Sequence, residues 1–257
     1  EKIYELYEQI CGARLTTNIG RIGGFERDFT PDVYRRLDEF LKDFPKALKE
    51  FENMVMRNRI FMDRTINTGP ISGERALEYG FTGPNLRAAG VDYDVRVMTP
   101  YSSYEDFDFI IPIGTQGDTY DRFCVREEEM WQSLSIIRQA LDKMPKTNEF
   151  FADVPEFYLP PKDAVYNTME GLIWHFKIVM GEVNVPKGQV YHCVEGGNGE
   201  LGFYLVSDGG RQPFRLHFRR PCFIYYQAYP EMIKGALLSD AIITMSSMNV
   251  IAGELDA

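Results

Sequence analysis

The chain has 257 residues, of which 44% are hydrophobic and 14% aromatic, and it carries a formal net charge of −10. This composition supports one large folded core, or one core with an appended subdomain, and excludes a disordered chain. The acidic charge argues against a nucleic-acid partner, because the longest basic patch is the short stretch 218–221. No apolar run approaches the roughly 20 residues of a membrane-spanning helix.

The cysteines and histidines do not follow the spacing of a metal site. The four cysteines lie far apart without a C-x-x-C pair, and the three histidines form no ligand pattern. Widely spaced cysteines are typical of free thiols in a reducing compartment. We therefore expect this chain to bind no metal.

Helical periodicity dominates the amino-terminal part. The sequence starts on Glu rather than Met, already inside a helical pattern over 1–15, so we expect the natural protein to begin earlier. Residues 29–65 predict one long helix with a kink at Pro45. Residues 66–96 predict one or two short helices, and 107–113 predict a short strand or a buried loop.

Two further amphipathic patterns follow. Asp118 is a suitable N-cap for a helix over 118–144. After a proline-rich connector, residues 163–180 predict another helix. Its inward-facing residues are expected to be Val165, Met169, Leu172, Phe176 and Val179.

The hydrophobic period then changes from helical to alternating. Residues 188–195 and 200–207 alternate like strands and are joined by a glycine-rich turn, and 211–220 predict a third strand. Residues 225–245 return to a helical pattern. These elements predict an antiparallel meander followed by a helix.

The element order predicts an α+β fold, mainly a helical bundle with a small antiparallel β-meander near the C-terminus. We expect a helical-bundle portion over 1–186, the meander over 187–222, and a C-terminal helix with a cavity-lining loop over 223–257. All three would form one structural domain.

Charged residues gather at the start of the helix predicted over 118–144. Asp118, Asp121, Arg122 and Arg126 fall at the i,i+3 and i,i+4 spacings that favour ion pairs. The simplest interpretation is capping together with a salt-bridged helix surface. A proton pathway or a subunit contact would fit the same pattern.

Nucleotide-binding motifs are absent from the sequence. It contains no G-x-x-x-x-G-K-[ST] stretch, and no G-x-G-x-x-G follows a predicted strand. We therefore do not expect this chain to bind a dinucleotide.

Six stretches, in order, resemble the quinone-site subunit of respiratory complex I, which is the D or 49-kilodalton subunit of proton-pumping NADH:quinone oxidoreductase. They span nearly the whole chain and resemble the carboxy-terminal portion of the family. The stretches are CGARLTTNIGRIGG, DEFLKDFPKALKEFE, ALEYGFTGPNLRAAGV, PYSSYEDFDFIIPIGTQGDTYDRFCVREEEMWQS, GELGFYLVSDGGRQPFRLHFRRP and GALLSDAIITMSSMNVIAGELDA.

The resemblance implies a protein that forms the quinone-reduction chamber with the B subunit and helps to couple electron transfer to proton translocation. It implies that the iron–sulfur cluster belongs to the B subunit, that NADH binds another subunit, and that this chain holds no cofactor of its own. The C and H subunits would be further partners, and the complex would be peripheral on the cytoplasmic face of a bacterial inner membrane. The charges at Asp118, Asp121, Arg122 and Arg126 would be candidates for coupling. The family's quinone-headgroup residues lie outside this stretch, so the isolated chain would not be catalytic.

The family is also related to the large subunit of nickel–iron hydrogenases, and this relation bears on the end of the chain. Aligned with the hydrogenase metal-binding segment, Asn249 and Val250 replace Asp and Pro, while Ile251 and Glu254 replace two cysteines. Neither side chain supplies a thiolate, so a nickel site is not expected. The resemblance implies a loop that lines the quinone chamber with Val250, Ile251, Ala252 and Gly253.

The sequence departs from the family near the partner's cluster. Arg14 matches the family, but Thr16 stands where members often have a histidine that titrates with the cluster. We expect a cluster potential that depends little on pH, which makes a lower-potential quinone such as a menaquinone a candidate substrate. The charges that the family commonly has at Asn249 and Ala257 are missing.

Two other function classes compete with the complex I subunit. A catalytic hydrogenase large subunit conflicts with Ile251 and Glu254. A non-catalytic scaffold that docks neighbouring subunits would describe the isolated chain, and it predicts that Ile251→Met leaves quinone kinetics unchanged.

Overall fold

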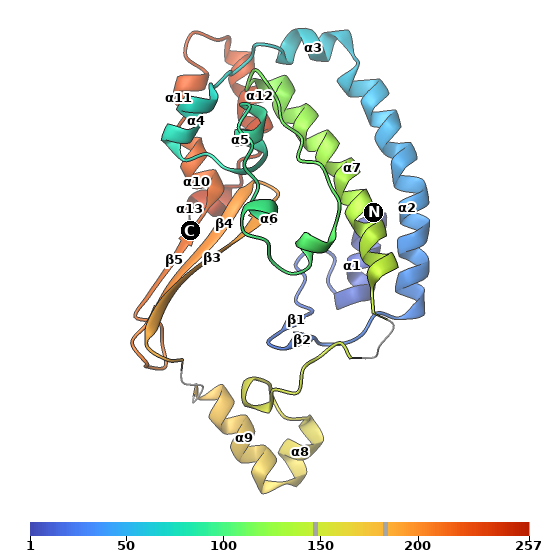
Figure 1. Cartoon of the computed structure of the whole chain (residues 1–257), viewed down its shortest axis with the longest axis vertical. Coiled ribbons are helices and arrows are strands. Elements are labelled where there is room, and N and C mark those ends of the chain that lie inside the picture. Colours follow the sequence, from blue (N-terminus) through green and yellow to red (C-terminus); the bar gives the residue numbers. More distant parts are fainter. Residues whose placement is uncertain (146–148, 182–184, 257) are drawn as a thin grey trace. The chain divides into compact units, whose positions relative to one another are not determined.

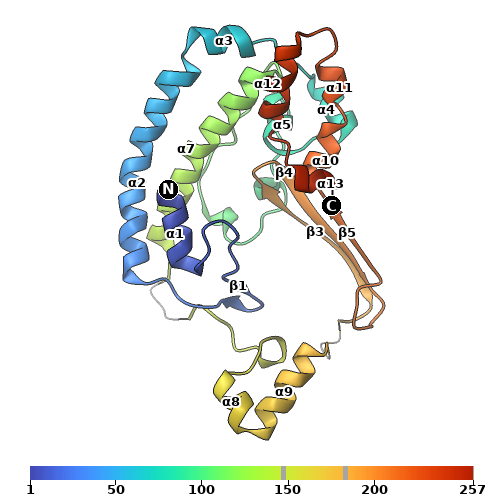
Figure 2. The same ribbon diagram turned by 180° about the vertical axis from the view of Figure 1, so that it is seen from behind.

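The computed structural model describes residues 1–145, 149–181 and 185–256, and it has an α+β fold (Figures 1 and 2). The α+β class and the mainly helical character match the sequence prediction. The chain divides into two compact units, each built from separate stretches. The first unit holds 1–44, 144–189 and 206–215, and the second holds 45–143, 190–205 and 216–257. The expected division into parts at 186 and 222 stays a prediction.

The first unit begins with α1 (Lys2–Cys11), which ends at Gly12 in the left-handed conformation. An antiparallel hairpin follows, in which β1 (Gly20–Arg21) pairs with β2 (Gly24–Phe25). Lys2 on α1 forms an ion pair of 2.6 Å with Asp43 on the helix after the hairpin. The helical start predicted over 1–15 is confirmed.

The helix predicted over 29–65 is three helices in the structure. They are α2 (Pro31–Phe51), the π-helical turn η1 (Glu52–Met56) and α3 (Arg59–Thr65). The α-helix runs through Pro45 and ends at Phe51. A new helix starts because the side chain of Asn58 accepts the N–H of Ile60 at 2.9 Å and caps it.

After α3, the chain forms the short helices α4 (Gly73–Tyr79), α5 (Gly83–Ala88) and α6 (Val95–Met98). A 3₁₀ turn, η2 (Tyr104–Asp106), follows. Residues 66–96 were expected to hold one or two short helices, and the structure adds α6.

Neither the strand nor the buried loop expected over 107–113 is present. Ile110 is 71% exposed and Ile113 is 44% exposed. The N–H of Asp108 donates to Gln139 Oε1 at 2.9 Å, and the N–H of Ile110 donates to Gln132 Oε1 at 3.0 Å. Side chains of the helix over 119–143 therefore accept the backbone N–H groups that a neighbouring strand would otherwise accept.

The helix predicted over 118–144 is confirmed as α7 (Thr119–Lys143). The helix predicted over 163–180 is broken into α8 (Lys162–Asn167) and α9 (Met169–Val179), after the 3₁₀ turn η3 (Pro155–Phe157). Thr168 Oγ1 accepts the N–H of Gly171 at 3.1 Å and thereby begins a new helix.

The expectation that the apolar stripe of 163–180 faces inside is wrong for most of its residues. The exposed fractions are 69% for Met169, 52% for Leu172, 59% for Phe176 and 60% for Val179. These side chains do not contribute to a core in this chain.

The predicted meander is present as a three-stranded sheet in the order β3–β4–β5 (Figure 1). The strands are β3 (Gly188–Gly196), β4 (Gly199–Ser207) and β5 (Arg215–Arg219). β5 is shorter than the stretch 211–220 that the alternation predicted.

The last helical segment, predicted over 225–245, is interrupted. It forms α10 (Pro221–Tyr226), α11 (Tyr229–Met232) and α12 (Leu238–Met248), and α13 (Ala252–Asp256) follows. Within the second unit, α5 and α12 both pack on α7 (Figure 1). The core of this unit contains Ile71, Ala76, Phe81, Leu86, Ala89, Cys222, Tyr225, Ala228, Met232 and Met248.

Candidate functional site

The last residues of the chain border a pocket in the second unit. Helix α12 ends at Asn249, whose left-handed φ of 58° and ψ of 50° turn the backbone toward Val250 and α13. The pocket has a volume of ≈ 510 Å³. Its lining is formed by Tyr226, Met245, Ser246, Asn249, Val250, Ala252 and Leu255.

The structure brings two of the four expected lining residues into this pocket. Val250 and Ala252 line it. Ile251 is 46% exposed, and a Cβ on Gly253 would meet open space, so both lie toward solvent in this chain. Sequence reasoning missed Tyr226 and Met245. The spacing of Met245 and Asn249, one helical turn apart, is the signal that would have found Met245.

The residues after α12, 249–256, form what we call the C-terminal segment, and α10 anchors it. The N–H of Cys222 donates to Glu254 Oε2 at 3.0 Å, and the hydroxyl of Tyr225 donates to the carbonyl of Asn249 at 3.3 Å. The Asn249 amide also donates to Asn198 Oδ1. The segment is thus tied at both ends to residues that are buried in the core.

The thiol of Cys222 lies 2.9 Å from the Tyr225 hydroxyl. Burial raises the pKa of the Cys222 thiol and also that of the Tyr225 hydroxyl. Both groups therefore stay neutral at physiological pH, and the Tyr225 hydroxyl acts as a hydrogen-bond donor to the C-terminal segment.

The two acids expected at the start of α7 cap backbone groups. Asp118, which is buried, accepts the N–H groups of Asn67 at 2.7 Å and Asp121 at 2.9 Å. Asp121 accepts the N–H groups of Thr115 at 2.8 Å and Gln116 at 2.6 Å. Capping by Asp118 is therefore confirmed, and these carboxylates hold the turn before α7 in place.

Arg122 lies in the interior rather than on the expected salt-bridged helix surface. It is 1% exposed, and its guanidinium donates to the carbonyls of Gly117 at 2.8 Å and Gly69 at 3.0 Å. Nε donates to Ser247 Oγ at 2.9 Å. Burial, together with the neighbouring Arg126, lowers the pKa of the Arg122 guanidinium.

Arg126 lies one turn further along α7 and reaches the end of α12. Nη1 donates to the carbonyl of Ser247 at 2.6 Å, and Nη2 donates to Asn85 Oδ1 at 2.9 Å. Burial lowers the pKa of this guanidinium too. Both arginines thus connect α7 to the residues that precede the C-terminal segment.

A second buried charge cluster surrounds Arg87 on α5. Its guanidinium contacts Asp94 at 3.2 Å, Glu195 at 2.8 Å and Glu129. Burial raises the pKa of Glu195 above its ordinary value, and the charge of Arg87 opposes this shift. Sequence reasoning missed this cluster, because Glu129 and Glu195 lie 42 and 108 residues from Arg87.

Arg14 and Thr16 belong to the first unit and are exposed. Arg14 forms ion pairs with Glu1 at 2.6 Å and Glu8 at 3.6 Å. Their expected place near a partner's cluster stays a prediction.

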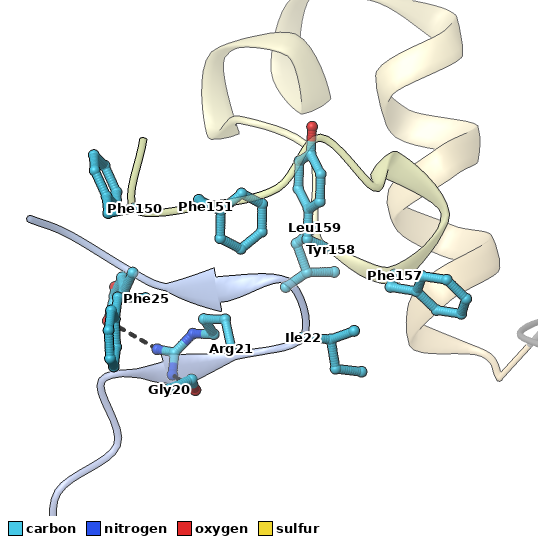
Figure 3. Close-up of a pocket in the computed structure, with 10 residues that line it drawn as sticks. Gly20, Arg21, Ile22, Phe25, Phe150, Phe151, Phe157, Tyr158 and Leu159 are labelled. Carbon is cyan, nitrogen blue, oxygen red and sulfur yellow. Dashed lines mark hydrogen bonds and ion pairs between the residues drawn. The ribbon is translucent and has the colours of Figure 1, made fainter. Parts of the chain in front are cut away.

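The first unit has a pocket of its own, of ≈ 710 Å³, between the β1–β2 hairpin and residues 150–159 (Figure 3). In Figure 3, Phe151 and Leu159 come from the segment on one side of the pocket, and Ile22 comes from the hairpin on the other. Arg21 is neutralised there by Glu26 at 2.8 Å. None of the residues predicted as functional lines this pocket.

Two features are absent from the residues that the structure describes. Across 1–145, 149–181 and 185–256, no helix combines the length and apolar character that a membrane crossing requires. The same residues contain no group of three or more His, Cys, Asp or Glu side chains arranged to hold a metal ion.

The chain resembles known proteins over its whole length. Residues 1–257 match the family described as "Respiratory-chain NADH dehydrogenase, 49 Kd subunit". The D subunit of the NADH-quinone oxidoreductase of Flavobacterium johnsoniae is 75% identical over 257 residues, which cover 100% of this chain and 62% of the relative.

More distant relatives carry the same description. The second D subunit of Cytophaga hutchinsonii is 73% identical over 260 residues, covering 100% of this chain and 66% of the relative. The D subunit of Leptospira biflexa is 56% identical over 256 residues, covering 100% of this chain and 63% of the relative. The chain thus spans less than two thirds of the length of these curated relatives.

Proposed function

Because the chain belongs to the family of the 49 Kd subunit of respiratory-chain NADH dehydrogenase, we propose that it works as the D subunit of a proton-pumping NADH:quinone oxidoreductase. The match over residues 1–257 and relatives of up to 75% identity support this proposal. The chain would reduce no quinone alone and would act within the assembled complex.

The observation that carries the site proposal is the pocket beside the C-terminal segment. Val250 and Ala252 line it, and the anchored backbone holds them in one arrangement. A pocket with apolar and aromatic lining suits a quinone ring. We propose that Val250, Ile251, Ala252 and Gly253 line the chamber in the complex, where a neighbouring subunit would cover the exposed Ile251.

The proposal extends to partners and cofactors. The B subunit would supply the iron–sulfur cluster near Arg14 and Thr16, and the C and H subunits would be further neighbours. NADH would bind a different subunit, and a menaquinone is a candidate substrate. The complex would be peripheral on the cytoplasmic face of a bacterial inner membrane.

A relation to the large subunit of nickel–iron hydrogenases is part of the same proposal. Glu254, which stands at a cysteine position of the hydrogenase segment, accepts the N–H of Cys222 at 3.0 Å. Its carboxylate therefore has a structural partner that requires no metal. Metal analysis of the purified complex tests the hydrogenase alternative, because nickel bound to this protein would favour it.

We also propose that Asp118, Asp121, Arg122 and Arg126 help to couple quinone reduction to proton translocation. Burial of Asp118 and Arg122 supports this role, since buried charges respond strongly to nearby changes in charge. Arg122 and Arg126 also donate to Ser247 near the end of α12, which links these two arginines to the helix that borders the pocket.

The test of the site is a pair of substitutions in the full-length protein within its complex. Val250→Met enlarges a side chain at the proposed chamber wall, and Ile251→Met replaces a β-branched side chain with a longer, flexible one of similar volume. We therefore expect the KM for quinone and the sensitivity to quinone-site inhibitors to shift severalfold. Ile60→Met is the matched control, because Ile60 on α3 is 74% exposed and distant in sequence from the pocket. Unchanged kinetics in both chamber variants would favour the non-catalytic scaffold.

A further inference from the structure

Helix α12 ends in the interior, where its last carbonyl groups need hydrogen-bond donors. The carbonyl of Ser246 accepts the N–H of Asn249 at 3.1 Å. The next two carbonyls receive side-chain donors from other elements. Arg126 Nη1 reaches the Ser247 oxygen at 2.6 Å, and Asn85 Nδ2 reaches the Met248 oxygen at 3.2 Å.

The two donors are themselves connected. Arg126 Nη2 donates to Asn85 Oδ1 at 2.9 Å, so the amide of Asn85 accepts on one side and donates on the other. Asn85 is fully buried on α5. Its amide orientation is thereby set, because the arginine can only donate and the Met248 carbonyl can only accept.

A cation at the C-terminal end of a helix is also favoured electrostatically. The partial negative charge of the helix dipole lies at the last carbonyls, where the Arg126 guanidinium is placed. Water cannot hydrate these carbonyls as it does at an exposed helix end, because Ser247 and Met248 are buried.

We propose that Arg126 and Asn85 form a clamp that positions the C-terminal segment, and that this is their role toward the pocket. The clamp fixes the last turn of α12, and the left-handed turn at Asn249 then directs Val250 and Ala252 into the pocket. Arg126 and Asn85 are absent from the pocket lining, so they are positioning residues. The consequence for quinone binding rests on the proposed function, whereas the positioning itself does not.

The direct test is hydrogen–deuterium exchange of the full-length protein. Arg126→Gln removes the donors to the Ser247 carbonyl and to Asn85 Oδ1, so amide exchange in 249–256 should accelerate by at least about tenfold, because two buried hydrogen bonds are lost. Asn85→Ala should accelerate exchange in the same segment. Arg126→Lys keeps the charge and a donor for Ser247, so it should restore protection in part.

The matched control is Arg59→Gln on α3, because the Arg59 side chain is 92% exposed. It should leave exchange in 249–256 unchanged. If the Arg126→Gln protein does not fold, exchange in the Arg126→Lys and Asn85→Ala proteins tests the clamp instead. Exchange in 249–256 that equals wild type in both of these variants would overturn the clamp.

Enzyme kinetics in the complex separate the clamp from the quinone proposal. If both hold, Asn85→Ala raises the KM for quinone by a larger factor than it lowers kcat. If Val250→Met and Ile251→Met both leave the KM unchanged while Asn85→Ala still accelerates exchange in 249–256, the clamp stands and the chamber proposal fails.

Discussion

Gly117 sits at a crossing of backbone segments that no larger residue would allow. Its φ is +65°, and an added Cβ would lie 2.0 Å from the carbonyl oxygen of Ile71. Its own carbonyl accepts the N–H of Ile71 at 3.1 Å and a guanidinium N–H of Arg122 at 2.8 Å. The glycine therefore holds the turn that begins α7 against the interior.

We expect Gly117→Ala to destabilise the protein by more than the about 1–2 kcal/mol of a left-handed alanine, because the close contact adds to it. Gly235→Ala is the control, since Gly235 has a φ of +83° and its added Cβ would meet nothing within 4 Å. Urea unfolding of both variants measures the difference. Equal losses in the free energy of unfolding for the two variants would show that the backbone near Ile71 shifts to accommodate the added methyl group at no cost in stability.

Arg87 balances three acidic side chains whose charges are withdrawn from water. Asp94 and Glu195 keep only 0% and 4% of their side-chain surface exposed. Removing Arg87 would leave Glu129 and Glu195 without this cation, whereas Asp94 keeps its ion pair with Arg96 at 2.6 Å. Arg75 offers a contrast, because its ion pair with Glu231 has side chains that are 46% and 45% exposed.

For Arg87→Met we expect a loss of about 3–5 kcal/mol in the free energy of unfolding at neutral pH. The loss should shrink in acid, where protonation removes the repulsion among the carboxylates. Arg75→Met should stay near wild type, since exposed ion pairs are screened by solvent. Denaturant titration at two pH values measures both, and a small loss for Arg87→Met would mean that water reaches the cluster.

At the scale of elements, α7 and the π-helical turn η1 meet through two carboxylates. Trp131 Nε1 on α7 donates to Glu127 Oε1 at 2.7 Å and to Glu52 Oε1 at 2.9 Å. Burial and the hydrogen bond to Glu52 raise the pKa of Glu127 to about 7. Glu128 adds a further negative charge, and Arg57 lies 4.0 Å from Glu52.

This contact makes stability depend on pH. Between the ordinary value of 4.5 and about 7, the folded protein holds a proton on Glu127 that the unfolded chain releases. Stability therefore falls as pH rises through this window. Glu127→Gln cannot ionise, so its gain in Tm over wild type should be larger at about pH 8 than at about pH 5.

The control for this prediction is Glu128→Gln, because Glu128 bonds to Gln132 at 2.9 Å, outside the hydrogen bonds of Trp131. Its Tm difference from wild type should vary less with pH. A Glu127→Gln difference that is the same at both pH values would show that the two carboxylates do not share a proton.

At the scale of the whole molecule, the proposed function depends on more than this chain. The chain spans 62% of the length of the Flavobacterium johnsoniae relative. Helix α9 keeps Met169 and Val179 exposed, although their spacing predicted a buried stripe. Ile251 is likewise uncovered in this chain, and under our proposal a partner would close the chamber over it.

Thr16 carries the prediction that belongs to the assembled complex. It is exposed here and cannot titrate near neutral pH. We expect the midpoint potential of the partner's cluster to change by much less than about 59 mV per pH unit, the value for one proton per electron. Thr16→His should introduce a pH dependence. Redox titration at two pH values is the measurement, and a full proton-coupled slope in the wild type would contradict the prediction.

Local sequence patterns were sufficient to predict the elements whose start, period and turns are encoded by residues close together in the sequence. The stripe and the cap at Asp118 predicted α7, and alternation with glycine-rich turns predicted the β3–β4–β5 meander. The order of six motifs indicated the family, which the match over the whole chain shows. Short-range rules succeed here because helix periodicity, capping and strand alternation are set by neighbouring residues.

The absence of a strand over 107–113 and the arrangement of the site were decided by contacts between distant residues. The side chains of Gln132 and Gln139 accept backbone N–H groups of 107–113 that a neighbouring strand would otherwise accept. No pattern within 107–113 indicates these hydrogen bonds. Arg126 and Asn85 donate hydrogen bonds to carbonyls at the end of α12, and they are separated from their partners by 121 and 163 positions in the sequence. The sequence alone determined where most helical and strand segments lie and which family the chain resembles. The tertiary structure decided which charges are buried and which of Val250, Ile251, Ala252 and Gly253 face the pocket, because burial and hydrogen bonding depend on the packing of the folded chain.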